Sequence, residues 1–246
     1  MILIKMRPSQ IADAVEQNLP VLMAAGVVEY HGPHLPIGTD FLMANCVCEE
    51  IEKRCECVLA PALTYGPTLS WAGGSGEGEM DFSPEAFYVY AREALNRLLK
   101  IGFRRIYVLQ FHQGDEGLQS LCLRKAAAEL VRDITGKWEE GWGRKNNRQW
   151  PEKNIFNIIK IASLDTFSNF PENLHCCLDF SHAGKGETQF VMAGYPDTVD
   201  LKALMGVSEE MAEWLGDAKE ADAEEGKRWI EYCVRGWVRE FSEKYY

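Results

Sequence analysis

The chain has 246 residues, 46% hydrophobic and 26% charged, a composition typical of a globular protein with a substantial core. Acidic residues outnumber basic ones by 37 to 26, and the formal charge of −11 argues against nucleic acid or an anionic membrane as the main partner. Because no repeat or low-complexity linker divides the sequence, we expect a single domain over residues 1–246.

The N-terminus and the cysteines favour a cytoplasmic location. Residues 1–8 lack the apolar region and cleavage site of a signal peptide, and the apolar run 20–28 is far short of the roughly 20 residues that span a bilayer. Eight cysteines in such a chain are typical of reduced thiols. Cys46 and Cys48 would point apart on a helix, so we do not expect them to share a metal.

Helices and strands alternate in the first hundred residues. The predicted elements are a short helix opened by Pro8 and stopped near Asn18, a strand buried on both faces at Val21–Gly26, a helix at Phe41–Lys53 and a short strand at Val58–Pro61. Residues 71–79 are rich in glycine but lack the lysine and spacing of a phosphate loop. They are interpreted as a mobile or tightly turned loop.

The next helix carries the clearest start and stop signals. Ser83, Pro84 and Glu85 are a cap, a first-turn proline and a first-turn acid, and the helix is predicted to run to Ile101 and end at Gly102. Its expected buried stripe consists of Phe87, Tyr90, Ala91, Ala94, Leu95, Leu98 and Leu99.

The second half of the chain continues the alternation. The predicted elements are a strand at Ile106–Phe111, a helix at Leu118–Ile134, a strand at Asn154–Ile161, an irregular segment at 165–182, a helix from near Ser181 to Ala193, and a helical tail from Ser208 with Trp214, Trp229, Ile230, Cys233, Val234 and Trp237 buried. The tryptophan-rich segment 136–151 fits a lid, an oligomer contact or a hairpin on the core equally well.

Residues 29–40, which follow the first strand, hold the densest group of polar side chains. They read Glu-Tyr-His-Gly-Pro-His-Leu-Pro-Ile-Gly-Thr-Asp. Glu29 and His31 lie two residues apart, so on a strand they face the same side, and a loop interrupted by proline and glycine returns Asp40 toward them. Carboxylate and imidazole ligands suit Zn, Mn or Fe, so we expect a metal site here rather than an idle polar loop.

A second polar cluster follows the strand at 106–111. His112, Asp115 and Glu116 lie just beyond its last residue. Ligands of open parallel sheets bind at the carboxyl ends of the strands, which places this cluster at the same edge as residues 29–40.

Three segments resemble the creatininase (creatinine amidohydrolase) family. Residues 29–40 resemble the family pattern E-x-H-G-P-H-L-P-x-G-T-D, residues 102–112 are similar to its G-F-R, strand and histidine block, and residues 182–188 are similar to its H-A-G-x-x-E-T block. The order and spacing agree over about residues 25–200.

The resemblance implies a three-layer α/β/α sandwich with a mainly parallel sheet, assembled as a homo-oligomer, often a hexamer. It implies a hydrolase of small cyclic amides or other non-peptide C–N bonds that uses two divalent metal ions (Zn, Mn or Fe) and a hydroxide bridging them. Carried over by position, the metal ligands are Glu29, His31, Asp40 as a bridge, His112 and Glu187. By the same resemblance, His182 is a catalytic residue beside the substrate, and Glu187 is a ligand or an acid/base group.

This chain departs from the family pattern at two places. The family's N-G-H-G-G-N is replaced by residues 110–115, with Gly114 where creatininase has a ligating glutamate, so the second metal would need Glu187, Asp115 or Glu116. The family's F-P-G-T is replaced by residues around 75–79, which adds acid near the expected substrate mouth. Creatinine is therefore not the expected substrate. A formamide, a peptide's terminal residue, or a catalytically altered metal- or ligand-binding subunit stand as alternatives.

Several polar residues also have a structural interpretation. His34 is expected to be a structural histidine under the loop, and His175 is interpreted as local packing. Capping of the helix start competes with metal binding for Glu187, and Asp115 and Glu116 could likewise cap the helix that follows them.

Overall fold

Four parallel strands form a sheet in the order β2-β1-β3-β4 in the computed structural model, which describes residues 1–152, 155–168 and 180–242. The strands are β1 (Val21–Ala25), β2 (Val58–Leu59), β3 (Ile106–Gln110) and β4 (Ile159–Ala162). β1 pairs with β3 along its whole length, so the carboxyl ends of these two strands lie side by side.

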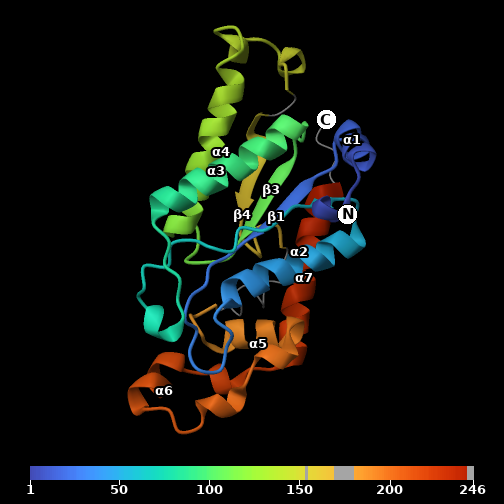
Figure 1. Cartoon of the computed structure of the whole chain (residues 1–246). Coiled ribbons are helices and arrows are strands. Elements are labelled where there is room, and N and C mark those ends of the chain that lie inside the picture. The colour runs from blue at the N-terminus through green and yellow to red at the C-terminus, as the bar shows by residue number, and fades with distance from the viewer. Residues whose placement is uncertain (153–154, 169–179, 243–246) are drawn as a thin grey trace.

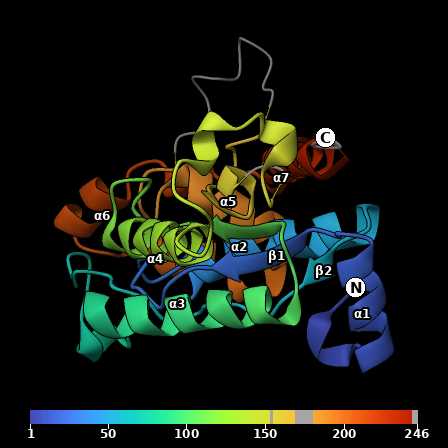
Figure 2. The same cartoon turned by 90° about the horizontal axis from the view of Figure 1, so that it is seen from above.

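Seven α-helices surround the sheet within the described ranges. They are α1 (Pro8–Glu16), α2 (Thr39–Arg54), α3 (Pro84–Ile101), α4 (Leu118–Thr135), α5 (Lys185–Gly194), α6 (Glu209–Leu215) and α7 (Ala223–Ser242). Figures 1 and 2 show α3 and α4 on one face of the sheet and α2, α5 and α7 on the other. The expected three-layer α/β/α arrangement with a parallel sheet is confirmed.

Successive residues of each central strand enter different cores. Leu22, Ala24, Tyr107 and Leu109 pack with α2, α5 and α7. The intervening strand residues pack with α1, α3 and α4. Side chains alternate across a strand, so a strand covered on both faces must be apolar at every position, as β1 is.

Most predicted boundaries agree with the structure to within two or three residues, but three expectations were wrong. The fourth strand begins at Ile159, because residues 155–157 form a 3₁₀ turn. Tyr90 is exposed on the outer side of α3 instead of belonging to its buried stripe. Trp214, expected in the core, is only half-buried and lies beside the candidate site.

The tryptophan-rich segment forms two 3₁₀ turns, Trp142–Arg144 and Asn147–Gln149, and no hairpin among its described residues. Trp142 packs edge-on against both Trp138 and Trp150, with ring centroids 4.8 and 4.9 Å apart. The segment projects beyond the C-terminal end of α4 (Figure 1). The other end of α4 follows the loop after β3, which carries His112. The segment is therefore not a lid over this chain's own site.

The six cysteines in the described parts of the chain are free thiols. No helix within residues 1–152, 155–168 or 180–242 is long and apolar enough to cross a membrane.

Candidate metal centre

Six polar side chains converge beyond the carboxyl ends of β1 and β3. Glu29 and His31 come from the loop after β1, and Asp40 is the second residue of α2. His112 follows β3, and His182 and Glu187 flank the start of α5. The five metal ligands that the resemblance implies and the catalytic residue His182 therefore lie in one cluster.

A glycine allows α2 to begin close to the end of β1. A Cβ atom at Gly26 would lie 2.4 Å from backbone atoms of Phe41, so a side chain there would push the helix away. The loop between them is closed by a hydrogen bond from the Glu29 N–H to the Ile37 carbonyl, 2.9 Å long. This close approach brings Asp40 beside Glu29 and His31.

The buried ligand atoms form two groups that share one carboxylate. Glu29, Asp40 and His112 form one group, in which His112 Nδ1 lies 3.0 Å from Asp40 Oδ2 and 3.3 Å from Glu29 Oε2. His31, Asp40 and Glu187 form the other, in which His31 Nε2 lies 3.5 Å from an oxygen of each carboxylate. Asp40 offers one oxygen to each group, as a bridging ligand would.

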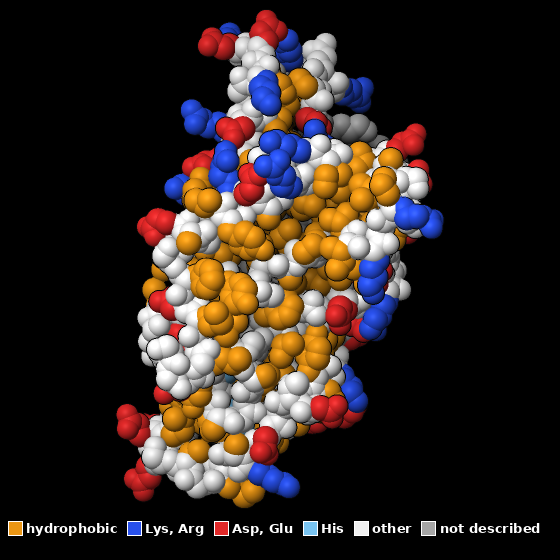
Figure 3. Space-filling view, in the orientation of Figure 1, with side chains coloured by type: hydrophobic (Ala, Val, Ile, Leu, Met, Phe, Trp, Pro, Cys, Tyr) orange, Lys and Arg blue, Asp and Glu red, His pale blue; other side chains and the backbone are white. Residues whose placement is uncertain are grey.

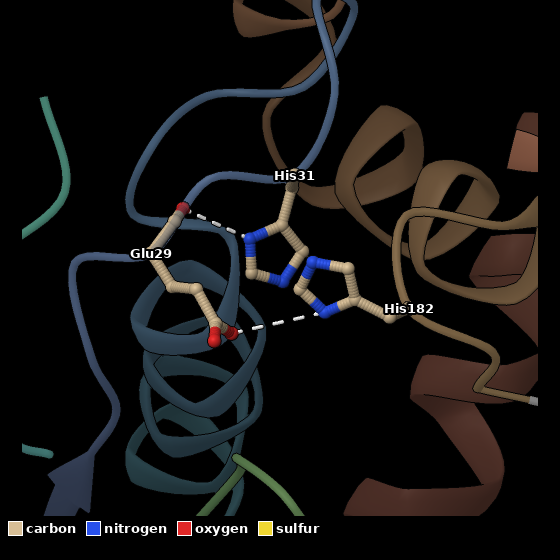
Figure 4. A group of neighbouring side chains, drawn as sticks. All are labelled: Glu29, His31 and His182. Atoms are coloured by element: carbon tan, nitrogen blue, oxygen red, sulfur yellow. Dashed lines mark hydrogen bonds and ion pairs between the residues drawn. The ribbon is translucent and has the colours of Figure 1, made fainter. Parts of the chain in front are cut away.

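His182 completes a third possible group with Glu29 and His31. Its Nδ1 lies 3.7 Å from Glu29 Oε2, and its ring centroid is 4.1 Å from that of His31. Figure 4 shows the two imidazoles facing each other above the Glu29 carboxylate. With 15% of its side chain exposed, His182 is less buried than the other five residues and borders the cavity.

Each histidine of the cluster is oriented by a backbone carbonyl. His31 Nδ1 lies 3.0 Å from the Glu29 carbonyl, His112 Nε2 lies 3.1 Å from the Pro67 carbonyl, and His182 Nε2 lies 2.8 Å from the Tyr30 carbonyl. A carbonyl can only accept, so the nitrogen that contacts it carries the proton. The second nitrogen of each ring then faces the carboxylates as a potential ligand or base.

Burial and the neighbouring charges shift the pKa values of the side chains in the cluster. Burial lowers the pKa of His31 and His112, but Asp40 and the neighbouring glutamates raise both more, to about 9 and about 10. Burial raises the pKa of Glu187 to about 8, whereas the two histidines outweigh burial at Asp40 and keep its pKa below the ordinary value. The pKa of His182 falls to about 4, mainly through burial and also through His31, which keeps its imidazole neutral at pH 7.

The donor set fits divalent cations. Both carboxylate oxygens of Glu29 and Nε2 of His31 are buried and make no hydrogen bond in the described part of the chain; Glu29 Oε2 and His31 Nε2 have only the ion-pair contacts of 3.3 to 3.7 Å given above. Unpaired buried polar groups of this kind are costly unless a ligand satisfies them. Imidazole nitrogens and carboxylate oxygens are ligands for Zn, Mn and Fe, and Asp40 is placed to bridge two such ions.

The remaining candidates lie elsewhere. Asp115 is exposed and pairs with Arg124 at 2.5 Å, and Glu116 is exposed as well. His34 is buried, with Nε2 2.9 Å from Thr188 Oγ1, and is structural, as expected. Glu79 does not add acid to the mouth, because it is buried outside the cavity. His175 lies outside the described residues.

A cavity of about 390 Å³ opens onto the cluster, within the size range of small-molecule sites. Trp71, Phe111 and Phe180 supply aromatic walls, and Asp165 lies on its lining. Trp71 and Trp214 also pack near His182, with ring centroids 4.8 and 5.7 Å from its own. The local sequence around these tryptophans gave no indication of this, because each comes from a segment far from the ligands.

A family model, a curated relative and several solved structures share the description creatinine amidohydrolase or creatininase. A family model described as creatinine amidohydrolase matches residues 5–241. Creatinine amidohydrolase from Pseudomonas putida is 22% identical over 92% of this chain and 89% of its own length. A variant creatininase in complex with creatine superposes with a TM-score of 0.76 at 20% identity, covering 99% of this chain and 98% of the other.

Metal-bound forms are among the similar structures. A creatininase variant described as Zn–Zn type has a TM-score of 0.75 at 20% identity and covers 98% of each chain. An Mn form of creatininase has the same TM-score and identity and covers 98% of this chain and 99% of its own.

Proposed function

This chain belongs to the creatininase family, and on that premise we propose that it is a metal-dependent amidohydrolase that cleaves a C–N bond of a small amide. The observation that carries the proposal is the pair of buried three-residue groups that share Asp40. Exposed acidic clusters are common without a function, but five buried ligands, four of them on the lining of one cavity, are costly to fold unless cations bind there.

In this proposal, Glu29, Asp40 and His112 hold one divalent ion, and His31, Asp40 and Glu187 hold the other. Zn, Mn or Fe ions bound here would lower the pKa of water and polarise a carbonyl oxygen. Glu187 is assigned to the second ion because Asp115 and Glu116 are exposed and belong to none of the three ligand groups.

We assign proton transfer to His182. Its Nε2–H is held by the Tyr30 carbonyl, so the unprotonated Nδ1 faces the cluster and the cavity. Nδ1 is placed to accept a proton from the attacking water, and the imidazole is neutral at pH 7 because its pKa is lowered to about 4. The same nitrogen then returns the proton to the leaving amine nitrogen, which balances hydrolysis of the amide.

The lining of the cavity favours neutral or positively charged amides. Glu29, Asp40 and Glu187 are assigned to the ions, so Asp165 is the one acid of the described lining that remains for a substrate, and that lining contains no Lys or Arg. A substrate carboxylate would find no basic partner in this lining, which argues against a peptide's C-terminal residue and for a cyclic amide or a formamide.

We also infer that the chain assembles into a homo-oligomer. Figure 3 shows hydrophobic side chains across the middle of one face, with Lys, Arg, Asp and Glu mainly around them. Val89 and Tyr90 are exposed on the outer side of α3. Large apolar patches on a protein surface mark interaction sites. Light scattering on a sizing column measures the state, and a monomer at micromolar concentration would contradict this inference.

A metal count combined with a substrate screen tests the proposed function. The purified chain is loaded with Zn, Mn or Fe, the bound metal is counted, and cyclic amides, formamides and short peptides are assayed. We expect two ions per chain and hydrolysis of a neutral or cationic small amide. One ion or none, with no turnover, would instead support a catalytically altered binding subunit.

A further inference from the structure

Glu79 is buried next to the candidate metal centre without lining its cavity. Only 5% of the residue is exposed, yet no Lys or Arg of the described chain pairs with its carboxylate. Instead, Oε2 accepts a hydrogen bond from the Tyr30 N–H at 3.2 Å, and Oε1 accepts one from the Thr68 hydroxyl. A buried carboxylate directed at one main-chain N–H holds that part of the chain in a fixed place.

The main chain that Glu79 contacts runs between two proposed ligands. Tyr30 separates Glu29 from His31, and its carbonyl accepts the hydrogen bond from His182 Nε2 at 2.8 Å. A continuous path therefore connects Glu79, the Tyr30 backbone and the His182 imidazole. The path determines which nitrogen of His182 carries the proton and which faces the site.

Two further contacts brace the same stretch. The Met80 N–H donates to the Val28 carbonyl at 3.0 Å, so Glu79 is delivered by a segment that is itself bonded to the residues before Glu29. Gly73 packs under Tyr30, where a Cβ atom would lie 2.6 Å from the Tyr30 Cβ. The loop of residues 73–80 therefore contacts residues 28–30 from one side and fixes their position.

We propose that Glu79 is a positioning residue that holds the Tyr30 main chain so that His182 presents an unprotonated Nδ1 to the site. This inference rests on the proposed function for its catalytic meaning, but its structural content is independent of turnover. It predicts that removing the carboxylate disturbs the tautomer of His182 and slows the chemical step, with little effect on substrate binding.

The test compares Glu79→Ala, Glu79→Gln and, as a matched control, Glu77→Ala. Glu77 lies two residues away on the same turn, is exposed, and accepts only the Gly74 N–H among the described contacts. Glutamine retains an acceptor for Tyr30 and a second polar group for Thr68, so Glu79→Gln should remain close to wild type. Removing a group that orients an active-site residue typically costs about 10- to 100-fold, so we expect a fall of that size in kcat for Glu79→Ala with a nearly unchanged KM.

The readout that does not need turnover is a ¹⁵N spectrum of the histidine-labelled protein loaded with Zn. The chain has only five histidines, and loss of a signal in His182→Ala assigns the one of interest. We expect a single Nε2–H tautomer in the wild type, in Glu79→Gln and in Glu77→Ala, and a mixture of tautomers in Glu79→Ala.

The outcomes separate the two proposals. If no amide is hydrolysed by the wild type with any metal, the proposed function fails while the spectrum still tests the role of Glu79. If Glu79→Ala only lowers Tm and leaves both kcat and the His182 signal unchanged, Glu79 is merely structural and the inference is overturned. Should Glu79→Ala not fold, Glu79→Asp takes its place, because a side chain shorter by one methylene withdraws the carboxylate from the Tyr30 N–H, and an unchanged kcat and spectrum there would overturn the inference equally.

Discussion

Replacing Glu187 by glutamine distinguishes a metal ligand from a helix cap. The Glu187 carboxylate is buried at the start of α5, where Oε2 accepts the Ala183 N–H at 2.7 Å and lies 3.5 Å from His31 Nε2. The first contact is that of a cap, and the second is that of a ligand. Glutamine keeps the size of the side chain and an acceptor for Ala183 but loses the charge that a divalent ion requires.

The magnitude for the metal-free protein follows from the pKa of Glu187, which burial raises from 4.5 to about 8. The pKa of Glu187 is higher in the folded state than in the unfolded state. The free energy of unfolding is therefore highest below pH 4.5 and falls as the pH rises through about 8. At about 1.4 kcal/mol per pKa unit, the cost at pH 7 is on the order of 3 kcal/mol. Glutamine avoids this cost, so metal-free Glu187→Gln should melt several degrees higher than wild type.

Metal binding should change in the opposite direction. The group of His31, Asp40 and Glu187 loses a charged ligand, while the group of Glu29, Asp40 and His112 is intact. We therefore expect about one ion per chain after dialysis instead of two, and at least a roughly 100-fold loss of affinity at the second position, since even groups behind the ligands cost 10- to 100-fold.

Differential scanning fluorimetry of metal-free protein at pH 5, 7 and 8 and elemental analysis of dialysed protein provide the two readings. The stability difference between Glu187→Gln and wild type should widen from pH 5 to pH 8. The reasoning is refuted if the variant retains two ions at wild-type affinity and its Tm is equal to or below that of wild type, because a cap would lose only the interaction of its charge with the helix.

Four further predictions use the same preparations. Asp40→Ala should abolish binding of both ions, and full metal occupancy in that variant would rule out the bridging assignment. His182→Ala should keep two ions and lose turnover, which rapid-quench assays and metal analysis check together. Asp165→Asn is tested on two lactams that differ in one charged amino group, 4-aminopyrrolidin-2-one and pyrrolidin-2-one. Because the Asp165 carboxylate is exposed, kcat/KM should fall by only about 2- to 5-fold for the charged lactam and stay unchanged for the neutral one. Equal effects on both would contradict a role in charge recognition. The raised pKa values of His31 and His112 stabilise the metal-free protein fully below pH 6.5, and this stabilisation is lost as the pH rises through about 9 to 10. The Tm of the metal-free protein should therefore fall over this range, and added Zn should reverse the fall.

Ligands at the ends of strands could be predicted from the sequence for a physical reason. Parallel strands begin and end at the same edges of a sheet, so Glu29 and His112, which follow different strands, had to lie near each other once both strands joined one sheet. The approach of Asp40 needed only a loop that turns back, and Gly26 permits it. No such rule applies to Trp71 and Glu79, which lie on loops, or to Trp214 on the short helix α6, because the positions of these segments depend on packing with the rest of the molecule.

The errors in the elements have equally local causes. Residues 154–161 are rich in isoleucine. A run of that length is equally compatible with one continuous strand and with a 3₁₀ turn followed by a shorter strand. Tyr90 falls at the margin of the apolar stripe of α3, and a helix covered on one side by α4 and the sheet buries only the middle of that stripe. Periodicity indicates which face of a helix is apolar but not how far the neighbouring elements extend over it.

The glycine at position 114 alters the cavity more than the ligand set. Gly114 follows His112 in a turn with φ of +65°, lies on the cavity lining, and has no atom within 4 Å of the place where a Cβ would stand. The space beside His112 is therefore open and available to a substrate, while Glu187, on α5, lies with Asp40 and His31 in the other ligand group. A chain that had simply lost its second metal position would have no reason to keep Glu187 buried with a raised pKa, because a neutral side chain would fold there at lower cost. The departure at Gly114 consequently supports a change of substrate within a retained two-ion centre rather than a loss of catalysis.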